Sequence, residues 1–175
     1  MTVEVRLVQP DDAAALAALV VRNREALAPW EPLHPDDYFT EAGQHRVLVQ
    51  ALARRARDEQ HPSVVLVDGR PAGRINLNDV VRGAFQNAHL GYWIDEQHQG
   101  RGVATAAVRA VLATAFGELG LHRVQAGTLL HNHASRRVLA KNGFTEVGLA
   151  PRYIRIAGRW QDHVLHQRLA DDPEP

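Results

Sequence analysis

The chain has 175 residues, of which 45% are hydrophobic, so one domain can bury a core without help from disulfides or structural metal. Lysine plus arginine and aspartate plus glutamate each number 20, and this zero net charge excludes a whole-molecule attraction to DNA or to an anionic membrane. The chain has 10 histidines and no cysteine. The lack of cysteine excludes a thiol metal site, a disulfide and a covalent thioester on the protein, and we expect no bound metal.

The N-terminal third predicts a strand followed by two helices. Val3 to Val8 alternates apolar and polar side chains, as a half-buried strand does. The residues from Pro10 to about Ala28 predict a helix rich in alanine and leucine. A proline-rich loop, Trp30 to Asp37, leads to a second helix that we expect to run from Pro35 to about Pro62.

The middle of the chain predicts three neighbouring antiparallel strands. Ser63 to Val67 and Pro71 to Val80 are short apolar runs joined by Asp68-Gly69, a dipeptide typical of a tight hairpin turn. His89 to Ile94 predicts the third strand. A long helix should follow, from Val103 to Gly120, because alanine is frequent there and a glycine ends it.

The C-terminal third predicts a strand at Arg123 to Thr128 and a short helix at Asn132 to Lys141. A closing hairpin should follow, with strands Phe144 to Ile156 and Arg159 to Leu169 turned by Ala157-Gly158.

These elements predict an α+β protein of three layers, with a mixed, mostly antiparallel twisted sheet flanked by helices. Without a repeat or a linker, residues 1–169 are predicted to form a single domain, and residues 170–175 a disordered tail. The N-terminus lacks the regions of a signal peptide, and no stretch approaches the roughly 20 apolar residues of a membrane span. We therefore expect a cytoplasmic protein.

A glycine-rich turn, Gln99-Gly100-Arg101-Gly102, lies between the predicted strand His89 to Ile94 and the predicted helix that begins at Val103. Glycines allow a sharp turn and a close approach of the backbone to a ligand, and the free N–H groups of the first helical turn attract an anion such as pyrophosphate. A tight connection that needs glycine for packing alone remains an alternative for an isolated pattern of this kind.

Two nucleotide-binding motifs do not fit this turn. A dinucleotide fingerprint needs a third glycine or alanine where Thr105 stands, and an acidic residue at the end of the next strand, which reads RVQAGT. A P-loop needs GxxxxGK followed by serine or threonine, which is absent.

Gln97 to Gly102 matches the Q-x-x-G-x-G signature of the GCN5-related N-acetyltransferases (GNAT), where this turn holds the coenzyme A pyrophosphate. From Asn78 onward the chain resembles the RimJ/RimL branch of that superfamily, especially the type that acetylates the N-terminal alanine of a ribosomal protein. The matching blocks are VVRGAF from Val80, LGYWID from Leu90, QGRGVAT from Gln99, NHASRRVLAKNGF from Asn132 and YIRIAGRWQDHVL from Tyr153. The resemblance implies the acyl-CoA N-acyltransferase fold, with acetyl-CoA as co-substrate.

By this resemblance, the backbone around Ile94 should bind the pantetheine arm of the coenzyme. The pyrophosphate should be bound by the residues of the turn and the first helical turn: Gln99, Gly100, Arg101, Gly102, Val103, Ala104 and Thr105. Asn132 and Ser135 match the family's N-x-x-S, in which the serine lies near the coenzyme sulfur, although Asn132 also suits a helix N-cap. Arg137, with Arg136 and Lys141, is expected to reach the 3′-phosphate of the coenzyme.

The acetyl group should pass directly to an amine, with Asn132 and Ser135 as catalytic candidates. A thiol leaving group has a pKa near 8.5, so a hydrogen bond from the Ser135 hydroxyl is enough to stabilise the thiolate. The tyrosine and glutamates that serve as acid or base in some relatives are replaced here by Leu139, Gly127 and Ile154. His89, acting through water, is the best candidate base, although a histidine on a half-buried strand also serves packing, and Glu31 and Tyr153 rank behind it.

The predicted acceptor is a primary amine, and Trp30, Glu31 and Tyr153 are expected to bind it. An α-amine with a pKa near 8 is roughly one-tenth neutral at pH 7, whereas a lysine amine near 10.4 is almost wholly charged. Without a clear base, an N-terminal α-amine is the favoured acceptor, and the resemblance favours that of a ribosomal protein with a small first residue. A small antibiotic or toxin amine is the second hypothesis, and a non-catalytic acyl-CoA-binding or ribosome-associated module the third. We expect a monomer or a homodimer.

Overall fold

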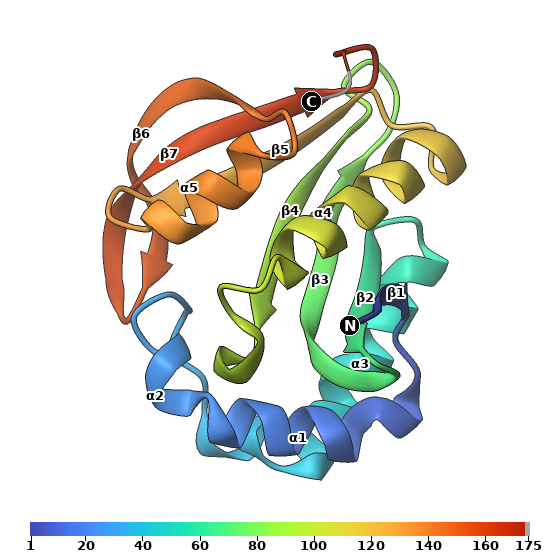
Figure 1. Cartoon of the computed structure of the whole chain (residues 1–175), viewed down its shortest axis with the longest axis vertical. Coiled ribbons are helices and arrows are strands. Elements are labelled where there is room, and N and C mark those ends of the chain that lie inside the picture. The colour runs from blue at the N-terminus through green and yellow to red at the C-terminus, as the bar shows by residue number, and fades with distance from the viewer. Residues whose placement is uncertain (174–175) are drawn as a thin grey trace.

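A computed structural model of the chain describes residues 1–173 and contains one seven-stranded sheet (Figure 1). The spatial order of the strands is β1-β2-β3-β4-β5-β7-β6. The strands are β1 (Val3–Leu7), β2 (Gln60–Val67), β3 (Arg70–Val81), β4 (Asn87–Ile94), β5 (Arg123–Leu129), β6 (Thr145–Ile156) and β7 (Arg159–Leu169).

All neighbouring strands pair antiparallel except β4 and β5, which are parallel. This parallel pairing is short, because it begins at Asn87 with Arg123 and ends at His89 with Gln125. Beyond that point β4 and β5 separate, although each continues for several residues. The sheet therefore opens in its middle, and the predicted mixed, mostly antiparallel α+β architecture is confirmed.

Helices cover both faces of the sheet and give the predicted three layers (Figure 1). The helices are α1 (Ala13–Arg22), α2 (Arg24–Leu27), α3 (Glu41–Ala56), α4 (Val103–Ala113) and α5 (His133–Ala140). On β2, Val65 and Val67 face the core beneath α4, whereas Val64 and Leu66 face the core beneath α1 and α3. This alternation is the two-residue period of a strand that is buried on both faces. In the part of the chain that the structure describes, no helix is both long and apolar enough to cross a membrane.

The N-terminal third differs from its prediction in two places. The first helix was expected to continue to about Ala28, but it breaks at Asn23 into α1 and α2, because the buried Asn23 side chain is used in long-range hydrogen bonds. The second helix begins only at Glu41 and ends at Ala56, and a short 3-10 helix, Asp36–Phe39, precedes it. The residues around His61 and Pro62 belong instead to the fully buried β2, because pairing with β3 overrides local preference.

The C-terminal third follows its prediction closely. Asp68-Gly69 and Ala157-Gly158 both have positive φ at their two central residues, as the predicted tight hairpin turns require. The predicted disordered tail was placed at residues 170–175, but as far as Pro173 the chain forms a turn in which Arg168 and Asp172 make hydrogen bonds. The rest of that segment, residues 174–175, lies outside the described residues.

Candidate active site

A cleft of about 510 Å³ lies beside the end of β4, at Tyr92 to Ile94, where the pairing with β5 has already ended. Most of the residues predicted to bind the coenzyme line it: Ile94, Gln99, Gly100, Gly102, Val103, Ala104, Thr105, Asn132, Ser135 and Arg137. Trp30, predicted on the acceptor side, lines the same cleft. Residues from β4, the glycine turn, α4 and α5, far apart in sequence, therefore surround one space.

The glycine turn forms one end of this cleft. Gly100 and Gly102 have φ values of 71° and 82°, in the left-handed region that side chains other than glycine rarely adopt. Gly102 is the N-cap of α4 and has no capping side chain, and the first bond within the helix runs from the Ala106 N–H to the Gly102 carbonyl. The N–H groups of Val103 to Thr105 thus have no partner within the helix and suit an anion.

The backbone of β4 offers further donors beside the turn. The Asp95 N–H donates to the Ala72 carbonyl of β3 at 2.8 Å, and because the N–H groups of a strand alternate in direction, those of Ile94 and Tyr92 point the other way, toward the open side. The Gln99 side chain donates to the Ile94 carbonyl at 3.1 Å, which fixes the turn against the strand.

The basic residues near the cleft differ in their positions. Arg137 and Lys141, from α5 and its end, line it. Arg136 does not line the cleft and forms an ion pair with Glu146 at 3.2 Å. Arg101 is exposed and is not among the residues that line the cleft, so its predicted contact with pyrophosphate stays a prediction.

A partly buried pair of hydroxyl groups joins β4 and α5 in the wall of the cleft. The Tyr92 hydroxyl lies 2.8 Å from Ser135 Oγ, and the Asn132 side chain accepts from the Ser135 N–H at 3.0 Å as the N-cap of α5. Burial raises the pKa of Tyr92 to about 12, against the smaller opposing effect of its hydrogen bond to Ser135, so the phenol keeps its proton at neutral pH.

Sequence reasoning missed Tyr92 because β4 and α5 are far apart in sequence. A signal was present, since Tyr92 has the same alternation parity along β4 as Ile94 and so shares its face of the sheet.

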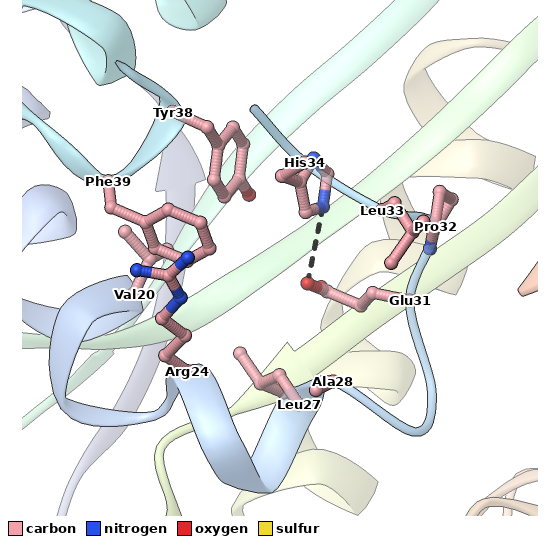
Figure 2. Close-up of a pocket in the computed structure, with 10 residues that line it drawn as sticks. All are labelled: Val20, Arg24, Leu27, Ala28, Glu31, Pro32, Leu33, His34, Tyr38 and Phe39. Carbon is pink, nitrogen blue, oxygen red and sulfur yellow. Dashed lines mark ion pairs between the residues drawn. The ribbon is translucent and has the colours of Figure 1, made fainter. Parts of the chain in front are cut away.

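A second pocket, of about 130 Å³, adjoins the cleft and shares Leu27 with it (Figure 2). Glu31 projects into this pocket, with His34 Nε2 3.4 Å from its Oε2. The His34 ring stacks on Tyr38 with a centroid distance of 3.8 Å. Burial raises the pKa of Glu31 to about 7, and the positive charge of Arg74 opposes that rise.

The loop that carries Trp30 and Glu31 contacts the C-terminal hairpin. The Ala157 N–H donates to the Glu31 carbonyl at 2.9 Å, and the Trp30 ring lies 5.3 Å from that of His131. Residues predicted on the acceptor side thus form a bridge from α2 to β6 and β7.

Two predicted residues lie away from both pockets. His89 occupies the last position of β4 that is paired with β5. It has the opposite parity to Tyr92 along the strand, so it faces the other side of the sheet. Tyr153 lies near Gly127, where an added Cβ would be 3.7 Å from the tyrosine Cε1 and 3.5 Å from His163 Cδ2. The roles predicted for His89 and Tyr153 stay predictions.

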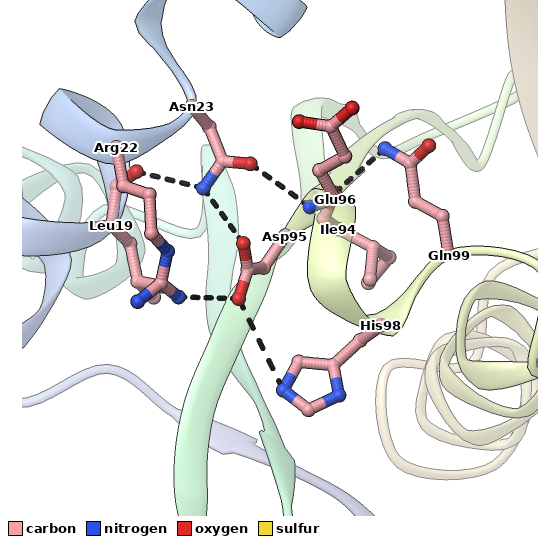
Figure 3. A network of polar contacts seen from close by, with 8 residues as sticks. All are labelled: Leu19, Arg22, Asn23, Ile94, Asp95, Glu96, His98 and Gln99. Atoms are coloured by element: carbon pink, nitrogen blue, oxygen red, sulfur yellow. Dashed lines mark hydrogen bonds and ion pairs between the residues drawn. The ribbon is translucent and has the colours of Figure 1, made fainter.

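A polar network joins the helix break at Asn23 to the glycine turn (Figure 3). Asp95 is 1% exposed and accepts hydrogen bonds from Arg22 and from Asn23, the latter at 3.0 Å. The Asn23 side chain also accepts from the Glu96 N–H at 2.9 Å. Burial alone would raise the pKa of Asp95, but the hydrogen bonds from Asn23 and Arg22 outweigh it and hold this pKa below its ordinary value.

Among residues 1–173, no three or more histidine, aspartate or glutamate side chains are grouped as a metal site would require.

Comparison with known proteins agrees with this geometry. Residues 2–145 match a family model described as an acetyltransferase (GNAT) domain. The Bacillus subtilis (strain 168) protein named as the probable N-acetyltransferase YjcK is 37% identical, over 99% of this chain and 97% of that protein. The [ribosomal protein uS5]-alanine N-acetyltransferase of Escherichia coli (strain K12) is 32% identical, over 98% of this chain and 89% of that protein. Mycobacterium smegmatis RimJ, solved in complex with CoA-disulfide, superimposes with a TM-score of 0.93 at 33% identity, over 97% and 82% of the two chains.

Proposed function

The chain belongs to the GNAT acetyltransferase family, and on this premise we propose that it transfers an acetyl group directly from acetyl-CoA to the N-terminal α-amine of a protein. The observation that carries the proposal is the cleft lined by β4, α4 and α5, which has backbone N–H donors at the glycine turn and the Tyr92–Ser135 pair in its wall.

The cleft has the donors that coenzyme A requires. The pyrophosphate would lie against the first turn of α4, where three N–H groups and the helix dipole favour negative charge. The amides of the pantetheine arm would pair with the open side of β4 near Ile94. Arg137 and Lys141 would supply positive charge for the 3′-phosphate. These contacts support acetyl-CoA as the co-substrate.

The hydroxyl pair would stabilise the departing thiolate. Because the Tyr92 phenol stays protonated, it can donate to Ser135 Oγ, which leaves the serine proton free to bond the coenzyme sulfur. A hydrogen bond to a charged group contributes about 1.5–3 kcal/mol, enough to favour departure of a thiolate whose pKa is near 8.5. Asn132 would act by fixing the first turn of α5, and therefore the position of Ser135.

The acceptor is proposed to be a ribosomal protein with a small first residue, because similar proteins that cover nearly the whole chain are named for acetylating a ribosomal-protein alanine. An α-amine near pKa 8 also needs less help to lose its proton than a lysine amine. A ribosomal acceptor implies that the protein works in the cytoplasm.

The test is to measure coenzyme A release at saturating acetyl-CoA with matched peptides. One set has a free N-terminal alanine, serine or leucine, and the control set has a blocked N-terminus and a free lysine. We expect release with the first set, fastest for the small residues, and mass spectrometry should locate the acetyl group on the α-amine. Turnover of small amines alone would indicate a small-molecule acetyltransferase. Coenzyme binding without turnover of any acceptor would indicate a non-catalytic module.

A further inference from the structure

We infer that Glu31 is the general base that removes the proton from the acceptor ammonium, directly or through one water molecule. This inference rests on the proposed function, since it names the proton acceptor for the same reaction. Glu31 lies outside the strands and helices of the sheet core, on the loop between α2 and the short 3-10 helix Asp36–Phe39.

The first argument is position. Trp30 lines the coenzyme cleft, the next residue lines the adjoining pocket, and Leu27 lines both. The loop is fixed at Glu31 itself, because its carbonyl accepts the hydrogen bond from the Ala157 N–H. The carboxylate therefore lies in the pocket that adjoins the cleft at Leu27, on a loop fixed to the turn between β6 and β7.

The second argument is that, among residues 1–173, the two pockets have no other carboxylate in their linings. Within the described residues, Glu31 is the one carboxylate in either lining. His98 lines the cleft, but it lies next to the glycine turn, with its Nε2 4.0 Å from Asp95. His89 lines neither pocket.

The third argument is the surroundings of the carboxylate. Burial, opposed by Arg74, brings the pKa of Glu31 to about 7, the range in which a base is both partly free and strong enough to accept a proton. Burial lowers the pKa of His34, so this ring is a neutral neighbour at pH 7. Burial also raises the pKa of Tyr38, which therefore remains a neutral phenol.

Two arginines provide the positive charges near Glu31. Arg74 of β3 is 6% exposed, makes no ion pair within residues 1–173, and has a buried Nε without a hydrogen-bond partner. Its charge limits the rise of the Glu31 pKa. Arg24 of α2 is held away by Asp36 at 2.9 Å and by the Phe39 ring, whose centroid is 4.2 Å from the guanidinium carbon. Arg74 is thus a positioning residue for the base.

The proton balance is complete without another reactant. The ammonium gives one proton to the Glu31 carboxylate, and the neutral amine attacks the thioester carbonyl carbon. The C–N bond forms and the C–S bond breaks, so the electron pair leaves on sulfur. The second amine proton ends on the thiolate or in solvent, and Glu31 returns its proton to solvent.

The experiment compares Glu31→Gln with Glu25→Gln, which changes an exposed carboxylate of α2 in the same way. For each, kcat/KM with an N-terminal alanine peptide is followed against pH, and acetyl-CoA binding is measured separately. We expect Glu31→Gln to lower kcat/KM at neutral pH about 10²-fold or more, with acetyl-CoA affinity unchanged. In the wild type kcat/KM should rise with pH through about 7, and this step should be absent in Glu31→Gln.

A peptide whose α-amine has a lower pKa provides a readout that a purely structural role would not move. It should recover much of the lost rate in Glu31→Gln, because its amine is already neutral. An unchanged profile in Glu31→Gln, or an equal loss with both peptides, would overturn the role of Glu31. If the wild type acetylates no peptide, the proposed function itself fails, and the two failures are therefore distinct.

Discussion

The side of the site proposed for the coenzyme is built mainly from backbone, whereas the side proposed for the acceptor is built from side chains. On the first side, the left-handed Gly102 and the N–H groups of α4 and β4 provide the donors. On the second, Glu31, His34 and Arg74 come from a loop and a strand distant in sequence. Backbone donors can serve one unchanging ligand with many sequences, while a pocket of side chains can change its acceptor by few substitutions. Under the proposed function, this difference would let the fold keep its co-substrate while the acceptor changes.

The largest effect is expected from Ser135→Ala, because Ser135 lies at the boundary between the proposed coenzyme side and the proposed acceptor side. Removing the hydroxyl should lower kcat about 10²-fold, as loss of one donor to a developing anion does, while the dissociation constant of acetyl-CoA stays within about threefold. Rapid-mixing kinetics and calorimetry measure the two quantities. Tyr92→Phe should lose less, and the double variant should lose little more than Ser135→Ala, since Tyr92 acts only through the Ser135 hydroxyl. Additive losses would contradict the proposed action of Tyr92 through Ser135.

The link between the two sides is tested by Asp95→Ala. Removing this buried carboxylate should lower the free energy of unfolding by about 2–3 kcal/mol, because Asn23 and Arg22 lose their partner. Denaturant titration measures the loss. Since the pKa of Asp95 is below its ordinary value when folded, its contribution is present above that ordinary value and is lost as pH falls through the lowered one. The difference between variant and wild type should therefore shrink in acid.

A smaller effect, confined to the coenzyme side, is expected from Gly102→Val. The space around Gly102 is open, so the cost comes from a φ of 82° that valine disfavours, about 1–3 kcal/mol. Acetyl-CoA affinity should fall about 10-fold or more in a binding titration. The order of preference among acceptor peptides should not change, and a changed order would contradict the separation of the two sides.

Glu31→Gln should change the free energy of unfolding by an amount similar to that expected for Gly102→Val. The variant should be more stable than the wild type, although its turnover should be lower. Because the pKa of Glu31 is raised from 4.5 to about 7, the wild type loses stability as pH rises across that interval. The variant should be more stable by about 1–2 kcal/mol at about pH 8, with no difference at about pH 4. Thermal unfolding at the two pH values measures this. A destabilised variant at high pH would mean that the carboxylate is structural.

The smallest effect is expected from Gly127→Ala. The new methyl group would lie in ordinary contact with Tyr153 and His163, so the fold should tolerate it. Because Gly127 lines neither pocket, kcat/KM should change less than about threefold for every peptide, and acetyl-CoA binding should not change. A loss confined to peptides with larger first residues would place Gly127 and Tyr153 at the acceptor pocket.

Sequence reasoning succeeded where local chemistry determines the structure. The hairpin turns at Asp68-Gly69 and Ala157-Gly158, the N-cap at Asn132 and the glycine turn all depend on the conformation of one or two residues. The resemblance added the branch, because its blocks lie mainly on the coenzyme side and in the closing hairpin.

Sequence reasoning failed where contacts between distant segments determine the structure. The break at Asn23 depends on Asp95, and the residues near His61 become a strand only because β3 lies beside them. For the same reason, neither the Tyr92–Ser135 contact nor the effect of Arg74 on Glu31 could be read from local patterns. The acceptor side consists largely of such contacts.

The early separation of β4 from β5 leaves two strand edges facing each other inside the molecule. A free edge is normally a risk, since it can recruit a strand from another chain. Here the freed end of β4 lies in the wall of the cleft, which residues of α4 and α5 also line. Under the proposed function, the pantetheine arm would act as a temporary extra strand, and each catalytic cycle would complete the sheet and open it again.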